Sequence, residues 1–402
     1  MDTGSSRSPA PEHQPATERT AAAGSPYHAA LSLERIEARV YRCPIERPVT
    51  TSFGTMADRP MMLVRLLADD GACGWGEAWC NFPGVGAEHR ARLVDSVFAP
   101  IVTSRRFESP RALFEELTRA TAVLAIQCGE PGPIAQSIAA IDLAAWDLVA
   151  RRAGMPLWRL LGGTTDRVAV YASGLNPDGP ERLAVERRTA GHTRFKIKIG
   201  FSEGRDLENL RALRRALGSD ATLMSDANQG WTLAQAEAMV GKLEQFDLQW
   251  LEEPLRADRP WHEWQQLADA SPVPLAAGEN IAGRKAFAAA LSSGALAVVQ
   301  PDAAKWGGIS GNLDVVADIA AAGRRYCPHF LGGGVGLLAS AHLLAGTGGD
   351  GWLEIDANPN PLRSLLEGPI AVIDDGTAVL GEAPGIGIDR LPAEIERFRV
   401  RH

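Results

Sequence analysis

The chain has 402 residues, of which 45% are hydrophobic and 22% are charged, and this composition is ordinary for a globular protein with a large core. Its formal net charge of −8 argues against nucleic acids and anionic membranes as partners. No uninterrupted apolar run reaches about 18 residues, so we expect no membrane span, and the five cysteines lack metal-ligand spacing and are expected to be free thiols in the cytoplasm.

The first part of the chain predicts a tail followed by an α+β unit. Residues 1–29 are rich in Ser, Pro and Ala and lack the apolar core of a signal peptide, which indicates a disordered tail. Residues 30–160 predict strands and then helices, with strands at Leu33–Val40, Met61–Leu67 and Cys73–Glu77. Between the first two strands, the polar segment Pro48–Thr55 is interpreted as a loop, which contains Phe53 and could cover a substrate.

Residues 161–361 contain apolar strand-like runs separated by Ala- and Leu-rich helical stretches. The runs recur at intervals of about 25 residues, which suit the strand, loop and helix of each repeat in a TIM-type barrel. They are Val168–Ala172, Phe195–Ile199, Thr222–Asp226, Leu248–Glu252, Leu275–Glu279, Ala297–Asp302, Tyr326–His329 and Trp352–Asp356. Residues 362–402 are rich in Pro and Gly and are expected to fold back onto the N-terminal unit.

Three consecutive runs end in an acidic residue. Asp226, Glu252 and Glu279 should converge, because neighbouring strands lie about 5 Å apart and their carboxyl ends meet at one face of a barrel. Three carboxylates this close repel one another unless a cation lies between them, and an all-oxygen ligand set favours Mg²⁺. The alternative is three separately solvated acids. Glu253 should point the other way and is not counted as a ligand.

Two lysines share one face of the run that precedes these acids. Lys196 and Lys198 alternate with apolar residues, a pattern that an exposed edge strand would also tolerate. Beside a metal site, two ammonium groups on one face should lower each other's pKa, which would free one of them to act as a base near neutral pH.

Asp302 and His329 end the sixth and seventh runs. A carboxylate that accepts an imidazole N–H fixes the tautomer and raises the basicity of the ring, so His329 is interpreted as a second proton carrier rather than a structural histidine. Glu354 ends the last run and, if protonated, could donate a hydrogen bond to a developing oxyanion; the alternative is a helix-capping or ion-paired acid. Together these groups predict removal of the proton next to a metal-bound carboxylate, giving an enediolate that the metal stabilises.

In combination, the motifs resemble the mandelate racemase and muconate lactonizing branch of the enolase superfamily over about residues 30–400. They are Lys196-Ile197-Lys198, Asp226-Ala227-Asn228, Leu251-Glu252-Glu253-Pro254, Gly278-Glu279, Pro301-Asp302, Trp306-Gly307-Gly308, Pro328-His329 and Leu353-Glu354. The resemblance implies an α/β fold in which a (β/α)7β barrel follows an N-terminal capping domain completed by the C-terminal segment. It also implies that Lys198 is the acid/base, with Lys196 assisting, and that Asp226, Glu252 and Glu279 hold one Mg²⁺.

The Asp302–His329 pair is similar to that of mandelate racemase-like members, and the chain has some similarity to galactarolactone cycloisomerase-like and acid-sugar dehydratase members. The resemblance therefore implies a Mg²⁺-dependent lyase or isomerase that dehydrates a sugar acid or isomerises its lactone. A racemase or epimerase that uses Lys198 and His329 is the alternative in the same fold. A Schiff-base aldolase and a non-catalytic binding protein are the alternatives from other classes.

The expected partner is a small carboxylate substrate, and we expect a homo-oligomer, either a dimer or an octamer. Substrate contacts are predicted on the loop at residues 52–59 and at a few barrel positions. They are Phe53, Arg59, Asn228, Trp306 and Arg363.

Overall fold

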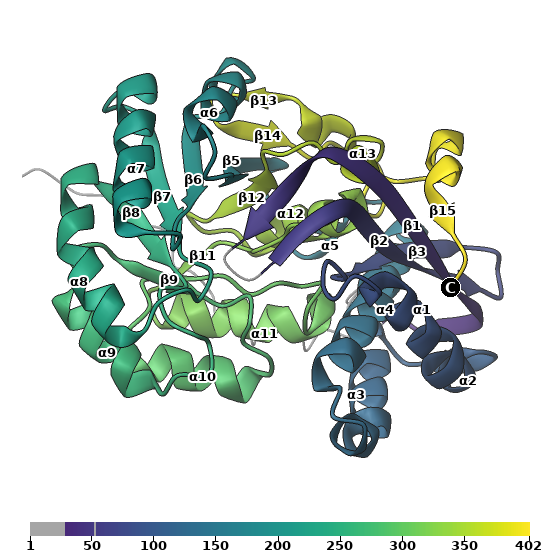
Figure 1. Cartoon of the computed structure of the whole chain (residues 1–402). Coiled ribbons are helices and arrows are strands. Elements are labelled where there is room, and N and C mark those ends of the chain that lie inside the picture. The colour runs from purple at the N-terminus through teal and green to yellow at the C-terminus, as the bar shows by residue number, and fades with distance from the viewer. Residues whose placement is uncertain (1–28, 52–53) are drawn as a thin grey trace, which may run out of the picture.

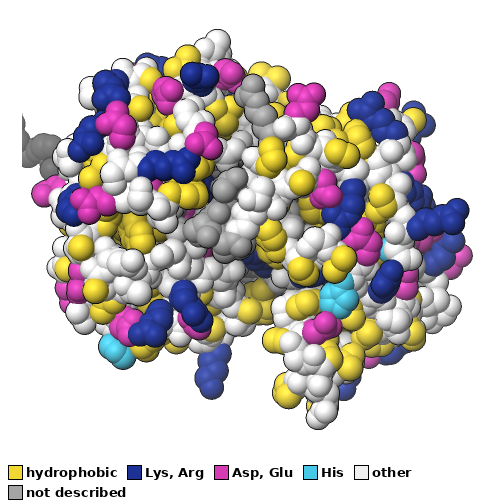
Figure 2. All heavy atoms as spheres, in the orientation of Figure 1, with side chains coloured by type: hydrophobic (Ala, Val, Ile, Leu, Met, Phe, Trp, Pro, Cys, Tyr) yellow, Lys and Arg dark blue, Asp and Glu magenta, His cyan; other side chains and the backbone are white. Residues whose placement is uncertain are grey.

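The computed structural model describes residues 29–51 and 54–402, without the side chains of residues 47, 50 and 51. The predicted tail up to residue 28, and Phe53, lie outside the described residues. The described chain forms a barrel surrounded by helices, on the left of Figure 1, and a smaller lobe of sheet and helices on the right. Both signs of charge are interspersed over the face seen in Figure 2.

The smaller lobe is a capping domain built on an antiparallel sheet with strand order β15-β1-β2-β3, in which β4 also pairs with β1. Its strands are β1 (Leu31–Thr51), β2 (Gly54–Ala68), β3 (Cys73–Ala78), β4 (Arg105–Phe107) and β15 (Arg399–Val400). Its helices are α1 (Gly86–Leu93), α2 (Ala99–Val102), α3 (Pro110–Gln127), α4 (Pro131–Arg152) and the short α5 (Leu157–Leu160). Because β15 pairs with β1 at Val40↔Val400, the C-terminal segment completes this domain, as predicted.

The hairpin of β1 and β2 corrects the predicted loop at residues 48–55. The two strands stay paired through Val49↔Met56, Thr50↔Thr55 and Thr51↔Gly54. A register shift between Pro44 and Val49 accommodates the prolines, which cannot donate to the ladder, and the β-branched residues then continue the strand. The described part of the predicted loop thus belongs to a long hairpin, with residues 49–51 paired to residues 54–56.

Helix α4 lies directly on β3. A β-carbon on Gly74 or Gly76 would overlap the backbone of α4 at Ala144 or Ala140, so these two glycines allow helix and strand to approach closely. By length and composition α4 could span a membrane, but 89% of its apolar window is buried inside the fold, where it serves as the core helix of the capping domain.

The larger lobe contains parallel strands in the order β12-β5-β6-β7-β8-β9-β10-β11. They are β5 (Arg167–Leu175), β6 (Arg194–Lys198), β7 (Thr222–Asp226), β8 (Leu248–Glu252), β9 (Leu275–Ala277), β10 (Val298–Val299), β11 (Arg325–Tyr326) and β12 (Trp352–Asp356). The intervening helices are α6 (Pro180–Thr189), α7 (Glu203–Leu217), α8 (Leu233–Leu243), α9 (Trp261–Ala270), α10 (Arg284–Ser293), α11 (Gly308–Ala321) and α12 (Gly334–Thr347), followed by α13 (Pro361–Ser364) and the hairpin β13 (Ile373–Asp374) and β14 (Thr377–Val379). This is the predicted (β/α)7β architecture.

Strands β9, β10 and β11 are shorter than predicted. Gly278, with φ +154°, ends the ladder of β9. Pro301 and Pro328 follow β10 and β11 and lack the N–H that a further ladder bond needs. The functional residues after these three strands therefore stand on loops, at the same end of the barrel as the other predicted site residues.

Side chains fill the barrel below that end. The filling residues are Tyr171, Met224, Trp250, Ala276, Val298 and Cys327. The rings of Tyr171 and Trp250 meet edge to face with centroids 5.5 Å apart. Between β11 and β12, the backbone N–H of Trp352 donates to Cys327 Sγ at 3.4 Å. The barrel interior is thus a packed floor, and chemistry is confined to the carboxyl ends of the strands.

Candidate active site

The predicted acids and lysines meet at the carboxyl ends of β6, β7 and β8. Parallel pairing aligns Lys198 with Asp226 and Asp226 with Glu252, so these side chains point to the same region. All of them are buried. Lys198 Nζ lies 2.5 Å from Asp226 Oδ2, and Lys196 Nζ lies 2.5 Å from Glu252 Oε1 and 2.7 Å from Glu354 Oε1.

These contacts correct the predicted tuning of the lysines. Burial alone would lower the pKa of Lys196, but the carboxylates of Glu252 and Glu354 outweigh it and raise this pKa well above its ordinary value. Asp226 likewise outweighs burial and raises the pKa of Lys198, although Lys196 opposes that effect. In both lysines the neighbouring carboxylates raise the pKa by more than the other lysine lowers it, so the mutual repulsion predicted from the strand pattern does not dominate.

The acids at this end of the barrel outnumber the cationic side chains. Six carboxylates lie in one network with three lysines and one histidine, so the formal charge of the network is −2 when every carboxylate is ionised and the histidine is protonated. The carboxylates belong to Asp226, Glu252, Glu253, Glu279, Asp302 and Glu354, and the cations to Lys196, Lys198, Lys305 and His329. A divalent cation would balance this excess, and the oxygen donors suit a hard ion.

The predicted ligands are turned toward these cationic side chains. Within residues 29–51 and 54–402, no three His, Cys, Asp or Glu side chains already surround an ion-sized position. Glu252 instead accepts bonds from Lys196, from Trp250 Nε1 at 3.2 Å and from Gln300 Nε2 at 2.6 Å. Burial raises the pKa of Glu252 to about 7, so a buried carboxylate is available here for a proton or a metal ion. In chemistry and position, the three acids fit a Mg²⁺ site.

The Asp302–His329 pair forms as predicted. His329 Nδ1 donates to Asp302 Oδ2 at 2.7 Å, and Nε2 faces Glu279 Oε2. Asp302 is itself held, because its Oδ1 accepts the backbone N–H of Ala304 at 2.8 Å. Burial by itself would lower the pKa of His329, but Glu279, Glu354 and Asp302 raise it to about 10, so the ring is an imidazolium that can donate a proton.

Glu354 differs from its predicted role. Its Oε1 accepts from Ser173 Oγ at 2.5 Å, and its Oε2 accepts from Phe330 N–H at 3.1 Å. Burial would favour the neutral acid, but Lys196 and His329 lower the pKa of Glu354 to about 2. Glu354 is therefore an ionised acceptor between Lys196 and His329, and the hypothesis of a protonated donor is wrong because it ignored these two cations.

Lys305 is a residue that the sequence reasoning missed. Its Nζ lies 3.1 Å from Glu279 Oε1 and 4.5 Å from the centre of the Trp79 ring, which belongs to the capping domain. The only sequence signal for Lys305 was its position three residues after Asp302, which ends a predicted barrel strand. Lys305 adds a fixed positive charge beside the third predicted metal ligand.

Two of the barrel residues predicted to contact substrate, Asn228 and Trp306, differ from each other in their surroundings. Asn228 donates to both carboxylate oxygens of Asp226, at 2.7 Å from its backbone N–H and 3.0 Å from Nδ2, and so orients that acid. Trp306 packs between Phe114 of α3 and Phe287 of α10, with centroid distances of 6.4 and 6.1 Å. Its position indicates a packing role between the capping domain and the barrel.

Arg59 and Arg363 both contact the segment after β12. Arg59 Nη2 lies 2.7 Å from Asp356 Oδ2 in a buried ion pair between the capping domain and the barrel. Arg363 Nη1 donates to the carbonyl of Asp356 at 2.7 Å. Both arginines therefore hold the end of β12, and contact with substrate stays a prediction for each.

Replacing Arg59 by alanine should lower the free energy of unfolding by about 3–5 kcal/mol, because Asp356 would remain buried without its partner. Urea denaturation followed by fluorescence would measure the change. The control is Arg284→Ala, which removes a surface pair with Asp318 and should cost no more than about 1 kcal/mol. Equal effects in the two variants would contradict an interdomain role for Arg59.

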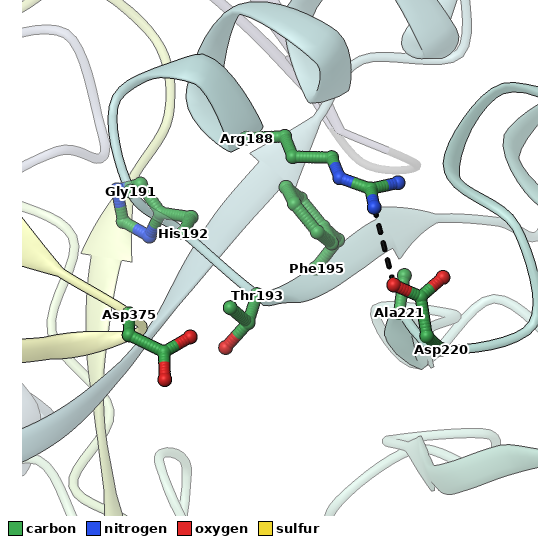
Figure 3. Close-up of a pocket in the computed structure, with 8 residues that line it drawn as sticks. All are labelled: Arg188, Gly191, His192, Thr193, Phe195, Asp220, Ala221 and Asp375. Carbon is green, nitrogen blue, oxygen red and sulfur yellow. Dashed lines mark hydrogen bonds and ion pairs between the residues drawn. The ribbon is translucent and has the colours of Figure 1, made fainter.

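A pocket of about 350 Å³ lies at the opposite end of the barrel (Figure 3). It is lined by residues that precede β6 and β7, by Phe195 of β6 and by Asp375 of the β13–β14 turn. Arg188 and Asp220, on one side of it, form an ion pair of 3.1 Å. None of the predicted site residues lines this pocket.

Comparison with known proteins identifies the family. Residues 35–162 match the mandelate racemase / muconate lactonizing enzyme N-terminal domain, and residues 181–393 match the enolase C-terminal domain-like model. The chain belongs to the mandelate racemase/muconate lactonizing enzyme family. The members to which it is similar include cycloisomerases, sugar-acid dehydratases and racemases. These relatives are all enzymes, but they catalyse different reactions.

Three members of the family are compared in detail. D-galactarolactone cycloisomerase from Agrobacterium fabrum is 31% identical over 362 residues, which cover 85% of this chain and 92% of that protein. The crystal structure of a mandelate racemase/muconate lactonizing enzyme from Bordetella bronchiseptica RB50 is 52% identical, with a TM-score of 0.87, and covers 92% of this chain and 99% of that one. A variant of L-talarate/galactarate dehydratase liganded with Mg and L-glucarate is 26% identical, with a TM-score of 0.81, and covers 100% of this chain and 97% of that one.

Proposed function

We propose that the protein removes the proton next to the carboxylate of a sugar acid or its lactone, and that dehydration or cycloisomerisation follows. The observation that carries this proposal is the placement of two proton carriers around one cluster of acids. Lys198 stands on β6, and the Asp302–His329 pair stands after β10 and β11. The relatives that isomerise a galactarolactone or hold Mg and L-glucarate support the substrate class.

Each side chain has a role that its contacts support. Lys198 takes the proton from the carbon next to the carboxylate; binding of Mg²⁺ by Asp226 would engage the carboxylate that raises the pKa of Lys198 and so favour its neutral form. Lys196 holds Glu252 and Glu354 in place. His329, kept in one tautomer by Asp302, donates a proton from Nε2 to the departing oxygen. Mg²⁺ held by Asp226, Glu252 and Glu279 would bind the substrate carboxylate and stabilise the negative charge that forms when the proton leaves.

A racemase or epimerase is the alternative function. It is favoured by the same placement, since bases on two walls of the barrel can address two faces of one carbon. The two functions differ in the role of His329, which gives a proton to a leaving group in the lyase and takes a proton from carbon in the racemase.

A panel of aldonic and aldaric acids and their lactones, incubated with the enzyme and Mg²⁺ in D₂O and followed by NMR, tests the proposal. We expect at least one acid to lose water, or one lactone to isomerise, with deuterium at the carbon next to the carboxylate. His329→Asn should still exchange that proton but form almost no product. A wild-type enzyme that neither exchanges nor converts any member of the panel would contradict the proposal, and scrambling of one stereocentre without other change would favour the racemase.

A further inference from the structure

The two residues of the proton-donating pair are each followed by a loop that contacts the capping domain. His329 leads into a Gly-rich loop and then α12, and Asp302 leads into a turn and then α11. One short segment of the capping domain, residues 77–81 at and after the end of β3, reaches both loops. The position of the pair therefore depends on a different domain from the one that carries it.

The contacts to the loop after His329 come from two sides. Glu77 accepts the backbone N–H of Gly333 at 2.6 Å and that of Gly336 at 2.8 Å. Asn81 Nδ2 donates to the carbonyl of Leu331 at 2.6 Å. From the barrel side, Glu354 accepts the N–H of Phe330. These bonds hold the loop both where it leaves the strand and where it enters the helix.

Glu77 serves as the cap of α12. The N-cap residue, Gly333, has no side chain that could accept the unpaired N–H groups of the first turn, and the Glu77 carboxylate takes their place. The positive end of this 14-residue helix also favours an anion there. Burial, partly offset by these backbone bonds, raises the pKa of Glu77 to about 7.

The loop glycines are required for this contact. A β-carbon on Gly333 would overlap Met61 and Glu77, and one on Gly336 would overlap the ring of Phe330. The capping domain and the loop are thus packed in direct contact, with no room for the loop to shift toward Glu77.

The loop after Asp302 is tied to the same segment. The Trp79 N–H donates to the carbonyl of Ala304 at 3.1 Å, and the Trp79 ring lies under Lys305 Nζ. Ala304 N–H in turn donates to Asp302. The segment 77–81 therefore fixes the loop after Asp302 and the loop after His329 relative to each other.

We infer that Glu77 is a positioning residue for His329: by holding Gly333 and Gly336, it sets where the imidazole stands relative to Asp302 and the substrate. This inference rests on the proposed function, in which His329 moves a proton. Among the described residues, Glu77 makes no hydrogen bond to the acid cluster or to His329, so its direct contacts are with the loop. Its charge also acts on Asp302 through space.

The test compares Glu77→Gln with Asp147→Asn in the full-length enzyme with Mg²⁺. Asp147 is a matched control, because it is a buried capping-domain carboxylate that also accepts two backbone N–H groups, those of Trp75 and Ile386, each at 2.8 Å. Each substitution replaces one acceptor oxygen by an amide NH₂, which opposes one of the two N–H groups. Asp147 holds neither loop of the pair.

Hydrogen–deuterium exchange with mass spectrometry gives the first readout. In Glu77→Gln, amides of residues 330–336 should exchange at least about tenfold faster than in wild type, and in Asp147→Asn they should not change. The second readout is turnover of any acid that the wild type converts. Glu77→Gln should lower kcat by about 10- to 100-fold with KM within about threefold, because a displacement near 1 Å is enough for such a loss.

Wild-type exchange in Glu77→Gln, or equal losses of kcat in the two variants, would overturn the inference, as would faster loop exchange with unchanged kcat. Should Glu77→Gln not fold, Asn81→Ala, which removes only the bond to Leu331, should shift both readouts in the same direction by less. A wild type inactive on every acid would contradict the proposed function instead, and the amide exchange would then still decide whether Glu77 holds the loop.

Discussion

Replacing Lys198 by methionine should lower both turnover and deuterium exchange by about 10³-fold. Lys198 is buried at the end of β6 with its Nζ 2.5 Å from Asp226, and it is the proposed base on this wall of the barrel. A positioned general base contributes about 10²–10⁴-fold to a rate. Methionine keeps the length and apolar stem of the side chain and removes only the proton carrier. The measurement is kcat and the rate of proton exchange by NMR in D₂O, on an acid that the wild type converts.

The control for this variant is Lys242→Met, which removes a half-buried surface lysine whose Nζ pairs with Glu203 at 2.7 Å. It should behave as the wild type in both assays. Circular dichroism should show that Lys198→Met is folded. A Lys198→Met enzyme that keeps more than about a tenth of the wild-type exchange rate would show that another group takes the proton.

The positions of the barrel strands and of the groups that end them were predictable from the sequence. Both depend on local pattern: an apolar run fits a buried strand, and the residue that ends it stands at the face where chemistry occurs in this architecture. Asp226 and Glu252 end strands whose predicted and observed bounds coincide. The three short strands were misjudged only in length, because a glycine or proline ends each ladder early.

The charge states of the site were not predictable in the same way. The strand pattern shows that Lys196 and Lys198 share a face, but not that Glu252, Glu354 and Asp226 lie within 2.7 Å of their ammonium groups. The raised pKa values of both lysines and the lowered pKa of Glu354 depend on those distances across strands. A one-dimensional pattern does not contain them.

The interdomain contacts were missed for a related reason. Glu77 ends a predicted strand of the capping domain, and nothing near it in the chain indicates that it caps a helix some 256 residues away. The ion pair of Arg59 was missed for the same reason, because its partner, Asp356, is 297 residues away in the sequence. Such pairs depend on how the two domains pack. The sequence shows the charged residue, but it does not show which distant residue is its partner.

Glu252→Gln should weaken Mg²⁺ binding at least about 100-fold. Outer-shell partners of a metal ligand alone are worth about 10- to 100-fold in affinity, so loss of a charged ligand should cost at least the upper end of that range. Gln keeps an oxygen that can accept from Lys196 or Gln300, so the barrel should remain folded. Isothermal titration calorimetry of the metal-free protein with Mg²⁺ measures the affinity.

The matched control is the adjacent residue. Glu253 has a φ of +41°, is buried and accepts from Asn280 Nδ2 at 2.8 Å, and it is not a predicted ligand. Glu253→Gln keeps an acceptor for Asn280 and should change Mg²⁺ affinity by no more than about tenfold. Affinity lost equally in both variants would mean that net charge, and not ligation by Glu252, binds the ion.

The pH dependence separates these explanations further. Because burial raises the pKa of Glu252 to about 7, the metal-free protein carries a proton there at lower pH, and that proton has to leave before the ion binds. The affinity of the wild type should therefore fall by up to about tenfold per pH unit below about 7 and level off above it. In Glu252→Gln the residue has no proton to lose, so this slope should disappear, whereas Glu253→Gln should keep it. A wild-type affinity that is flat from pH 5.5 to about 8 would contradict Glu252 as the ligand that titrates.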